Sequence, residues 1–490
     1  MKFKITLLLL LVSFSILSQN ITAKLIDTST KQTIPYANIK TGAYAGVISN
    51  DEGFFTVAYK KDTKLISISC MGYENKTLTI AAIKKLNFII ELQQAINKLD
   101  EVFISTTAPN ANTIIAKVKA KIVDNYNLDL QYYNVFKRSK YNADFKNLEF
   151  EIDKASDVKK KQLEGVNSSL HTLVNHVKNS NMVQFVDFKG AVYILNKDSI
   201  KLKIEKATEL LDHKNDFSID NIQEKMQNII LKYLDTTKTY KLKTGLFKIE
   251  DSLALNDDDF KDNVKNEFTV SYLNDETKYI LNRAQFYENS FLNKILDTDL
   301  YDYKFEDMAY NNGVLTYILT FYPRKGKAKY TGQLYIADDT YAITRVNYNY
   351  YKDRHGQKVN LRLLLGVKYI ENKSKGTIIF EKDSSQRYYP KYIKSSTGNY
   401  FYVSRPLKFI ENSSTKNKVS FDFTIEGENK NEFELLVTRH NTLSIADFET
   451  EIQAEKAPYI KLSKYEKSIW DNERILEPSL EMKTFDGENN

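Results

Sequence analysis

Apolar and polar positions alternate along the first part of the chain in short runs that turn residues separate. In KLISISC, Ile66, Ile68 and Cys70 fall on one face of a strand and the residues between them on the other. We expect the first set to point inward, with Cys70 a small core residue rather than a reactive thiol. Seven such runs predict a seven-stranded β-sandwich over residues 19–93. The runs are ITAKLID, IPYANIKT, AGVIS, GFFTVAY, KLISISC, ENKTLTI and LNFIIEL.

The stretch Asn50-Asp51-Glu52-Gly53 lies between two of these runs and has two interpretations. Its amide and carboxylate oxygens next to a glycine are typical of a calcium loop. A calcium ion needs six to eight oxygen ligands, however, and no second acidic run lies beside this one. A turn that ends in a glycine of left-handed conformation explains the same residues. The sequence therefore favours a hairpin tip over a metal site.

Helical periodicity appears in three places after the sandwich. Residues 112–126 place Ile114, Ile115, Val118 and Ile122 on one face, and Asn112 or Thr113 can cap the start. A second helix is predicted at 218–234, capped by Ser218 or Asp220, and a third, more polar one at about 157–178.

From about Tyr240 onward β-patterning dominates and predicts an antiparallel meander, one large curved sheet with the helices packed on one side. The fold class is therefore mainly β, with a linker at 94–111 and an α+β domain at 112–456. The charged tail at 457–490 is expected to form a surface helix followed by disorder. The predicted strands are TYILTFYP, GQLYIAD, YAITRVNYNYY, LRLLLGVKYIE, GTIIFEK, YPKYIKS, YFYVSR and VSFDFTIEG.

The N-terminus predicts export. Lys2 and Lys4 precede an apolar run from Ile5 to Leu17 that is short for a membrane span and is followed by small and polar residues, as in a secretory signal peptide. Cleavage is expected after Ser18, which makes residues 1–18 the signal peptide. A retained N-terminal anchor is the alternative. No later stretch reaches a membrane-spanning length, so we expect a soluble or peripheral mature chain.

Composition narrows the class of protein further. The chain of 490 residues has a net charge of +7 from 70 basic and 63 acidic residues, which are mixed along it, so nucleic-acid binding is not expected. Its 33 tyrosines and 27 phenylalanines against 7 prolines favour β-structure. Cys70 is the single cysteine, so no intramolecular disulfide and no lipidated first residue are expected. The mean hydropathy of −0.45 excludes a bundle of transmembrane helices.

Three separated motifs carry a family resemblance. They are Pro35, Ala37, Asn38 and Ile39 in IPYANI, then Gly53 and Phe55 in the turn that follows, then Gly72 and Tyr73 in MGYE. In this order they resemble the carboxypeptidase-regulatory-like domain, a transthyretin-like sandwich of cell-envelope proteins of the Bacteroidota type. The first strand has Ala23 where the family more often has glycine. The resemblance implies a non-catalytic accessory module.

Two further segments resemble parts of other envelope proteins. LDEVFISTTAPN is similar to the connector that follows this domain in TonB-dependent receptors, although the chain is too short for their barrel. GQLYIADDTYAITRV resembles a hairpin of half-barrel lipoprotein carriers, which hold lipid in a concave sheet. The overall layout resembles Bacteroidota envelope proteins that begin with the same sandwich.

No motif for catalysis emerges. None of the histidines at 171, 176, 213, 355 and 440 has a glutamate three residues on, as a zinc carboxypeptidase needs, and only His213 with Asp216 comes near. We expect these histidines at the surface. Ser413 and Lys416 have Ser-x-x-Lys spacing but fall in a polar turn. The acidic runs at 255–263 and 297–307 are expected to be solvated loops or strand edges rather than calcium sites. We assign no catalytic residue, metal ligand or cofactor.

These observations favour a non-enzymatic, exported envelope protein that binds or scaffolds something in the periplasm or at the periplasmic face of the outer membrane. Aromatic residues on both faces of the predicted sheet leave more apolar surface than a few helices cover. We therefore expect a groove in residues 240–425 that accepts a lipid, an acyl chain or a strand of an envelope partner. A fully covered sheet is the alternative for the groove, and a hydrolase with a nonstandard site is the alternative for the function.

Overall fold

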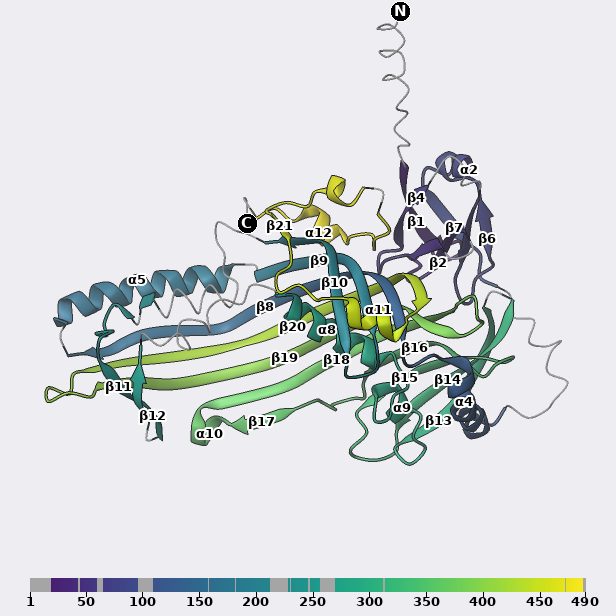
Figure 1. Cartoon of the computed structure of the whole chain (residues 1–490). Helices are drawn as coiled ribbons and strands as arrows, with labels where there is room; N and C mark the ends of the chain where they lie inside the picture. The colour runs from purple at the N-terminus through teal and green to yellow at the C-terminus, as the bar shows by residue number, and fades with distance from the viewer. Residues whose placement is uncertain are drawn as a thin grey trace, which may run out of the picture.

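Figure 1 shows the chain as a computed structural model, with a small sandwich beside one very large sheet. The structure describes residues 19–487, except for 43–44, 60–64, 96–108, 157, 181, 212–227, 230, 246, 256–268, 312 and 472. The predicted signal peptide lies outside the described residues, as do most of the predicted linker at 94–111 and most of the predicted helix at 218–234.

The N-terminal part is a sandwich of two sheets, as the alternation predicted. The strand order is β4-β1-β7 in one sheet and β3-β2-β5-β6 in the other. Ile66 and Ile68 are buried between them, and Cys70 packs against the same core while staying partly exposed. A short helix α2, capped by Thr79, was not predicted. The elements are β1 (Gln19–Asp27), β2 (Asn38–Gly42), β3 (Ala45–Ile48), β4 (Phe54–Tyr59), β5 (Ile66–Ser69), β6 (Lys76–Leu78), α2 (Ile80–Lys85) and β7 (Ile89–Leu92).

The second part is built on a 14-stranded sheet in which β13-β14-β15-β16-β18-β19-β20-β8-β9-β10-β21 lie in this order. Strand β17 pairs with β18, and β11 pairs with β12 and β19. Its strands are β8 (Gln131–Ala155), β9 (Met182–Ile194), β10 (Ile200–Leu210), β11 (Thr239–Thr244), β12 (Phe247–Ala254), β13 (Tyr301–Asn311), β14 (Val314–Pro323), β15 (Tyr330–Ala337), β16 (Ile343–Tyr350), β17 (Lys358–Leu361), β18 (Val367–Lys382), β19 (Tyr388–Glu411), β20 (Lys418–Thr442) and β21 (Tyr459–Leu462).

The predicted antiparallel meander is confirmed, but its strands are longer and begin earlier than predicted. Strands β8 and β20 have 25 residues each and β19 has 24. The gaps between predicted strands at residues 372–375 and 396–399 are wrong, since both stretches lie within paired strands. A side chain at Gly376 would meet the Lys394 carbonyl oxygen, so glycine serves close strand approach there rather than a turn. Strands β8, β9 and β10 were not predicted.

The run LRLLLGVKYIE, predicted as one strand, is divided in the structure. Strand β17 ends at Leu361, a single helical turn α10 follows at Arg362–Leu365, and β18 begins at Val367. Gly366 ends the turn with a φ of +62°, a conformation that favours glycine. The apolar run therefore forms a protruding turn at the edge of the sheet (Figure 1).

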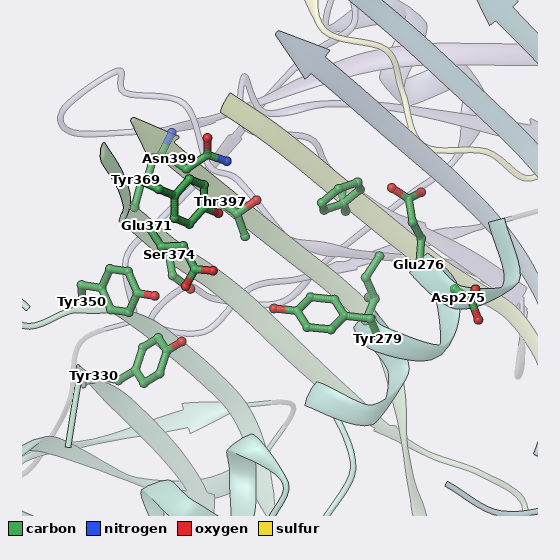
Figure 2. Close-up of a pocket in the computed structure, with 14 residues that line it drawn as sticks. Asp275, Glu276, Tyr279, Tyr330, Tyr350, Tyr369, Glu371, Ser374, Thr397 and Asn399 are labelled. Atoms are coloured by element: carbon green, nitrogen blue, oxygen red, sulfur yellow. The ribbon is translucent and has the colours of Figure 1, made fainter. Parts of the chain in front are cut away.

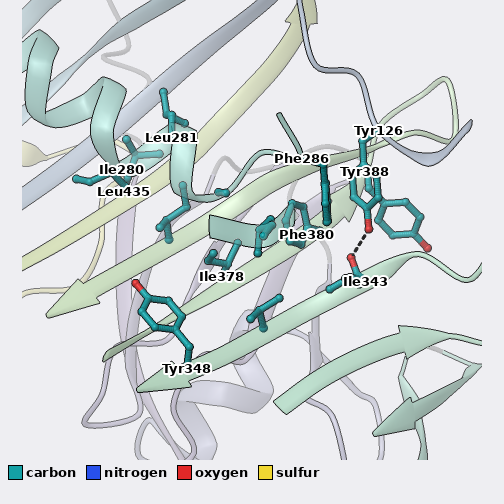
Figure 3. Close-up of a cluster of buried hydrophobic side chains, with 14 of the residues drawn as sticks. Tyr126, Ile280, Leu281, Phe286, Ile343, Tyr348, Ile378, Phe380, Tyr388 and Leu435 are labelled. Atoms are coloured by element: carbon teal, nitrogen blue, oxygen red, sulfur yellow. Dashed lines mark hydrogen bonds between the residues drawn. The ribbon is translucent and has the colours of Figure 1, made fainter. Parts of the chain in front are cut away.

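Helices cover one face of the large sheet. Alternate residues of β20, among them Leu435 and Val437, share a core with α4, α8 and α9. Figure 3 shows Ile280 and Leu281 of α8 beside Leu435, and the hydroxyl of Tyr126 donating to the Ile343 carbonyl at 2.8 Å. Toward the far end of the long strands, α5 packs over a second core of the same sheet. The helices are α4 (Ala111–Asn125), α5 (Lys160–Asn179), α8 (Val270–Arg283), α9 (Phe291–Ile295) and α11 (Ile445–Thr450).

The helix predicted at 112–126 is confirmed, but its predicted cap is wrong. The helix starts at Ala111, and the Asn110 side chain accepts a hydrogen bond from the backbone of Thr113 at 3.1 Å. Asn110 is extended, which is the conformation that a cap requires. Both residues predicted as caps, Asn112 and Thr113, lie inside the first turn.

The other face of the large sheet carries the sandwich and the C-terminal segment. Leu436 of β20 shares a core with Ile48 of the sandwich and with Trp470. The predicted surface helix with a disordered tail is therefore wrong, because this segment contributes buried apolar residues to two cores. After β21, which pairs in parallel with β10, it forms the 3-10 helix η1 (Lys467–Trp470) and the helix α12 (Leu480–Thr484).

Candidate functional site

A cleft of about 450 Å³ lies on the helix-covered face of the large sheet. Helix α8 forms one wall, and strands β15, β16, β18 and β19 form the other and the floor (Figure 2). Its side chains are mainly polar or aromatic. They include the tyrosines Tyr279, Tyr330, Tyr350 and Tyr369, the carboxylates Asp275, Glu276 and Glu371, and the residues Lys373, Ser374, Thr397 and Asn399.

Helix α8 is fixed as a wall by its amphipathic pattern. The Thr269 hydroxyl accepts a hydrogen bond from the backbone of Tyr272 at 3.1 Å and so caps the helix. Leu273 and Ile280 are buried against the sheet. Tyr279 lies on the open side, half exposed, and Figure 2 shows its hydroxyl pointing toward the strands. The helix thus presents an aromatic ring with a polar tip to the cleft.

A buried ion pair stands at the base of this wall. Lys137 of β8 is fully buried, and its Nζ donates to Glu276 at 2.8 Å and to the Ser139 hydroxyl at 2.7 Å. Tyr141 also donates to Glu276, at 2.8 Å. Burial lowers the pKa of Lys137, and the Glu276 carboxylate opposes that effect. Glu276 is therefore held in one position by two neighbours on β8.

The strand wall is equally ordered. Tyr330 and Tyr350 are register partners on β15 and β16, and their rings stack with centroids 5.0 Å apart. Glu371 accepts a hydrogen bond from the backbone of Gln357 at 2.8 Å. Burial raises the pKa of Tyr350 and of Tyr369, so both hydroxyls stay protonated at neutral pH and can donate to a ligand.

Arg283, at the end of α8, connects the two walls. Its guanidinium lies over the ring of Phe291 at 4.4 Å and over that of Tyr330 at 5.6 Å. Burial by itself raises the pKa of Tyr330, but the Arg283 charge and the hydrogen bonds with Ser374, Arg283 and Tyr350 together outweigh that effect and lower it. The Tyr330 ring thus lines the cleft and has the Arg283 cation against one of its faces.

The sequence predicted a groove within residues 240–425, and all the lining residues fall in that range except Phe433. The sequence did not identify the ion pair under it. Lys137 occupies an inward position in the alternation that includes Tyr133 and Val135, where an apolar residue is normal. A lysine at such a position is the signal that could have revealed a buried charge.

The stretch Asn50–Gly53 forms the predicted hairpin tip. The Asn50 side chain accepts hydrogen bonds from the backbone of Glu52 at 3.0 Å and of Phe54 at 2.8 Å. Gly53 has a φ of +78°, and a Cβ there would come within 2.6 Å of the Leu25 carbonyl oxygen. These contacts leave the amide oxygen of Asn50 committed to the turn.

The two carboxylates of this tip bind other parts of the chain. Asp51 accepts a hydrogen bond from Tyr36 and pairs with Lys394 of β19. Glu52 accepts from the backbone of Leu480, at the start of α12, at 3.1 Å. Within the described residues, no cluster of three or more acidic, histidine or cysteine side chains could hold a metal ion. The acidic tip is a joint between the sandwich, the large sheet and the C-terminal segment.

A smaller pocket of about 250 Å³ lies at this joint, between the sandwich and the large sheet. Cys70 lines it together with Arg345 and Glu381. Burial raises the pKa of Cys70 to about 11, so its thiol is protonated at neutral pH. Glu381 pairs with Lys40 of the sandwich at 2.6 Å. The pocket is thus part of the joint, which ion pairs such as this one hold together. A protonated thiol in this position agrees with Cys70 as an unreactive residue.

The described histidines differ in exposure, and His355 is half-buried. His171 and His176 are exposed on α5, as predicted, and His213 lies outside the described residues. The prediction of a surface position is wrong for His440, whose ring stacks on Tyr389 at 4.8 Å. His440 lies on β20, which the sequence did not extend that far, so its burial could not be predicted.

The remaining candidates are surface features. Ser413 accepts a hydrogen bond from the backbone of Lys416 at 3.3 Å in an exposed turn, which explains their spacing. The acidic run at 297–307 ends in β13, at the edge of the large sheet, as predicted for a strand edge. Most of the run at 255–263 lies outside the described residues.

Comparison with known proteins gives information about the sandwich. The family model of the CarboxypepD_reg-like domain matches residues 21–104. Searches of curated proteins and of solved structures found no match. Among the described residues, no helix has the length and apolar character to cross a membrane. The N-terminal sandwich of this chain is thus a carboxypeptidase regulatory-like domain.

Proposed function

We propose that the chain is a non-enzymatic binding protein of the cell envelope and that the cleft between α8 and the strands holds its ligand. The cleft carries this proposal, because its walls are formed in advance. Glu276 is fixed by Lys137 and Tyr141, and the Tyr330 and Tyr350 rings are stacked. A site that needs no rearrangement binds without the cost of ordering its side chains.

The lining supports a polar, hydroxyl-rich ligand such as an envelope glycan more than an acyl chain. An acyl chain would remove water from the carboxylates of Asp275 and Glu371 and offer them no hydrogen bond in return, which costs free energy. Tyrosine rings offer apolar faces, and their hydroxyls, the carboxylates and the Asn399 amide can exchange hydrogen bonds with ligand hydroxyls. A glycan satisfies both kinds of group.

Binding of purified envelope glycans, followed by calorimetry, tests this assignment. Tyr279→Ala combined with Tyr350→Ala should weaken binding about tenfold or more, since aromatic residues in a formed pocket contribute most of the affinity. Tyr310→Ala is the matched control, because Tyr310 is exposed on β13 outside the cleft. Co-extraction of lipid with the purified protein, or equal binding by the cleft variant, would contradict the proposed ligand.

We propose the periplasm or the periplasmic face of the outer membrane as the location. The N-terminal pattern of a signal peptide and the carboxypeptidase regulatory-like domain support it. Cell fractionation with protease protection tests this part separately. Recovery of the protein from the cytoplasm would refute it while leaving the cleft assignment open to its own test.

The hydrolase alternative has no observation in its favour beyond carboxylates in a cleft. Glu276 and Glu371 both accept hydrogen bonds that fix the wall to which they belong. A structural role explains each of them. Turnover of a bound glycan by the wild-type protein, lost in a Glu276→Gln or Glu371→Gln variant that still binds, would reverse this preference.

A further inference from the structure

An exposed apolar edge lies away from the cleft and from the joint with the sandwich. Leu363 and Leu364 of α10 have exposed fractions of 101% and 79%, so this chain covers neither side chain. Four neighbours extend the edge, namely Phe247 and Ile249 of β12 and Val359 and Leu361 of β17, all of them exposed. We call these six residues the leucine lip.

Arg405 of β19 holds the two halves of the leucine lip together. Its side chain donates to the Leu365 carbonyl beside α10 and, at 3.1 Å, to the Thr244 hydroxyl beside β12. Its guanidinium also lies over the Phe247 ring at 5.7 Å. The two turns, more than a hundred positions apart in sequence, therefore form one edge, at the lower side of the sheet in Figure 1.

Positive charges outnumber negative ones in the two turns that form the leucine lip. The segment KVNLRLLLGVK, residues 358–368, contains Lys358, Arg362 and Lys368 and no acidic residue. The segment TYKLKTGLFKI, residues 239–249, contains three lysines and likewise no acidic residue. Two acidic residues, Glu250 and Asp251, follow this second segment directly, and Asp251 pairs with Lys248 and Lys241. Basic residues thus lie on both sides of the leucine lip.

We propose that the leucine lip docks the protein on an anionic lipid bilayer, with the leucines of α10 inserted at the level of the head groups. Exposing apolar side chains to water costs free energy, and their insertion at the boundary between head groups and acyl chains removes this cost. Lysine and arginine beside them gain from the negative surface potential of anionic lipids. The same basic residues argue against a second copy of the leucine lip as the partner, because the positive charges of the two copies would repel each other.

Docking through the leucine lip would place the protein on a membrane with its sandwich and C-terminal segment on the far side of the large sheet (Figure 1). The cleft is built from α8 and from other stretches of the strands, so it remains open to a ligand. The proposal therefore adds a membrane contact to the proposed glycan binding and depends on different residues.

Vesicle co-sedimentation tests the proposal. The chain is expressed from Gln19 onward, because the predicted signal peptide would itself bind lipid. We expect it to sediment with vesicles of phosphatidylglycerol and phosphatidylcholine and to be released by high salt, and to bind pure phosphatidylcholine weakly. The double variant Leu363→Asp/Leu364→Asp should bind at least about tenfold more weakly, with an unchanged thermal transition because both side chains are exposed.

Ile452→Asp is the matched control, since Ile452 has an exposed fraction of 86% but lies between Glu451 and Glu455. It should bind vesicles like the wild type. Binding that the leucine variant retains, or that the Ile452 variant loses equally, would overturn the proposal. So would concentration-dependent dimerisation that the leucine variant abolishes, which would assign the lip to self-association. Glycan binding is also measured for the leucine variant, so that a failure of membrane docking can be told apart from a failure of the cleft assignment.

Discussion

The sandwich and the large sheet differ in how far along the chain their strands find partners. In the sandwich, β2 pairs with β3 across a few residues, and β5 pairs with β6 in the same way. In the large sheet, β8 pairs with β20, and the Thr438 hydroxyl reaches the Asn134 carbonyl across 304 positions. Local alternation is enough to specify the first region. The second also depends on pairings, such as that of β8 with β20, that no local pattern reveals.

The two regions also differ in the number of hydrophobic cores to which a single strand contributes residues. The strands of the sandwich share one local core, to which β3 adds Ile48 as a contact with the large sheet. Strand β20 contributes Leu435 to the core under α8, Leu436 to the core with the sandwich and Phe421 to the core under α5. A long strand therefore connects more surfaces of different character than a short one, and β20 also contributes Phe433 to the binding cleft.

The largest expected effect is in the core of the sandwich. Ile68→Asp should destabilise it by about 4 kcal/mol or more, because Ile68 has an exposed fraction of 1% and the carboxylate would have no partner there. We expect the sandwich to unfold while the large sheet keeps its own denaturation transition. Urea denaturation followed by circular dichroism, with Trp470 fluorescence as a second probe at the seam, measures both transitions.

A fragment of residues 19–97 sharpens this comparison. Since its core is local, it should fold alone and show one cooperative melt. Leu65→Asp is the control, because Leu65 is exposed on the same stretch. A fragment that does not melt cooperatively, or an Ile68 variant that melts like the wild type, would show that the sandwich depends on the large sheet.

The next effect concerns the large sheet. Glu276→Gln leaves Lys137 buried without its carboxylate and should cost about 3 kcal/mol, the usual result of removing one partner of a buried pair. Asp275→Asn on the exposed side of the same helix is the control and should change little. The urea midpoint of the large-sheet transition is the measurement. Equal midpoints for the two variants would contradict a stabilising role for the pair.

The sequence allowed a prediction of the seven strands of the sandwich, the hairpin tip and the helix at 112–126. It did not allow prediction of β8, β9 and β10, since their alternation includes buried charges such as Lys137 and Asp187. It began a new strand at Gly376 and placed a break at Gly398, because glycine is common in turns and its use for close strand approach depends on the partner strand. The cleft was predicted only as a region, since its walls come from elements that meet in the fold.

A smaller effect is expected where the two regions meet. Asp51 pairs with Lys394, and the Asp51 side chain is half exposed, so solvent weakens the interaction. A double-mutant cycle of Asp51→Asn and Lys394→Met should give a coupling of about 1 kcal/mol. The exposed pair of Lys31 and Glu91 within the sandwich is the control and should give a coupling near zero.

Trp470, the single tryptophan, is buried at this seam and reports its opening as a red shift of fluorescence. The Asp51 and Lys394 variants should therefore shift the emission before global unfolding, and those of the control pair should not. EDTA should leave every transition unchanged, since the tip is a turn. A transition that EDTA lowers would restore the calcium interpretation.

The smallest expected effect is a pH dependence in the large sheet that arises from a histidine, a residue type that the sandwich at 19–93 does not contain. Burial lowers the pKa of His440 below its ordinary value of 6.5, and the Asp383 carboxylate opposes this effect only in part. Below pH 6.5 the unfolded chain therefore binds a proton that the folded chain does not, so the stability of the large sheet falls as the pH falls. The loss of stability should level off once the pH passes below the pKa of His440 in the folded state.

His440→Gln should reduce this loss of stability, by less than about 1 kcal/mol between pH 6.5 and the pKa of the folded state. His171→Gln on exposed α5 should leave the loss unchanged. Urea midpoints at several pH values measure the slope, and the same slope in the His440 variant would assign the pH dependence to other groups.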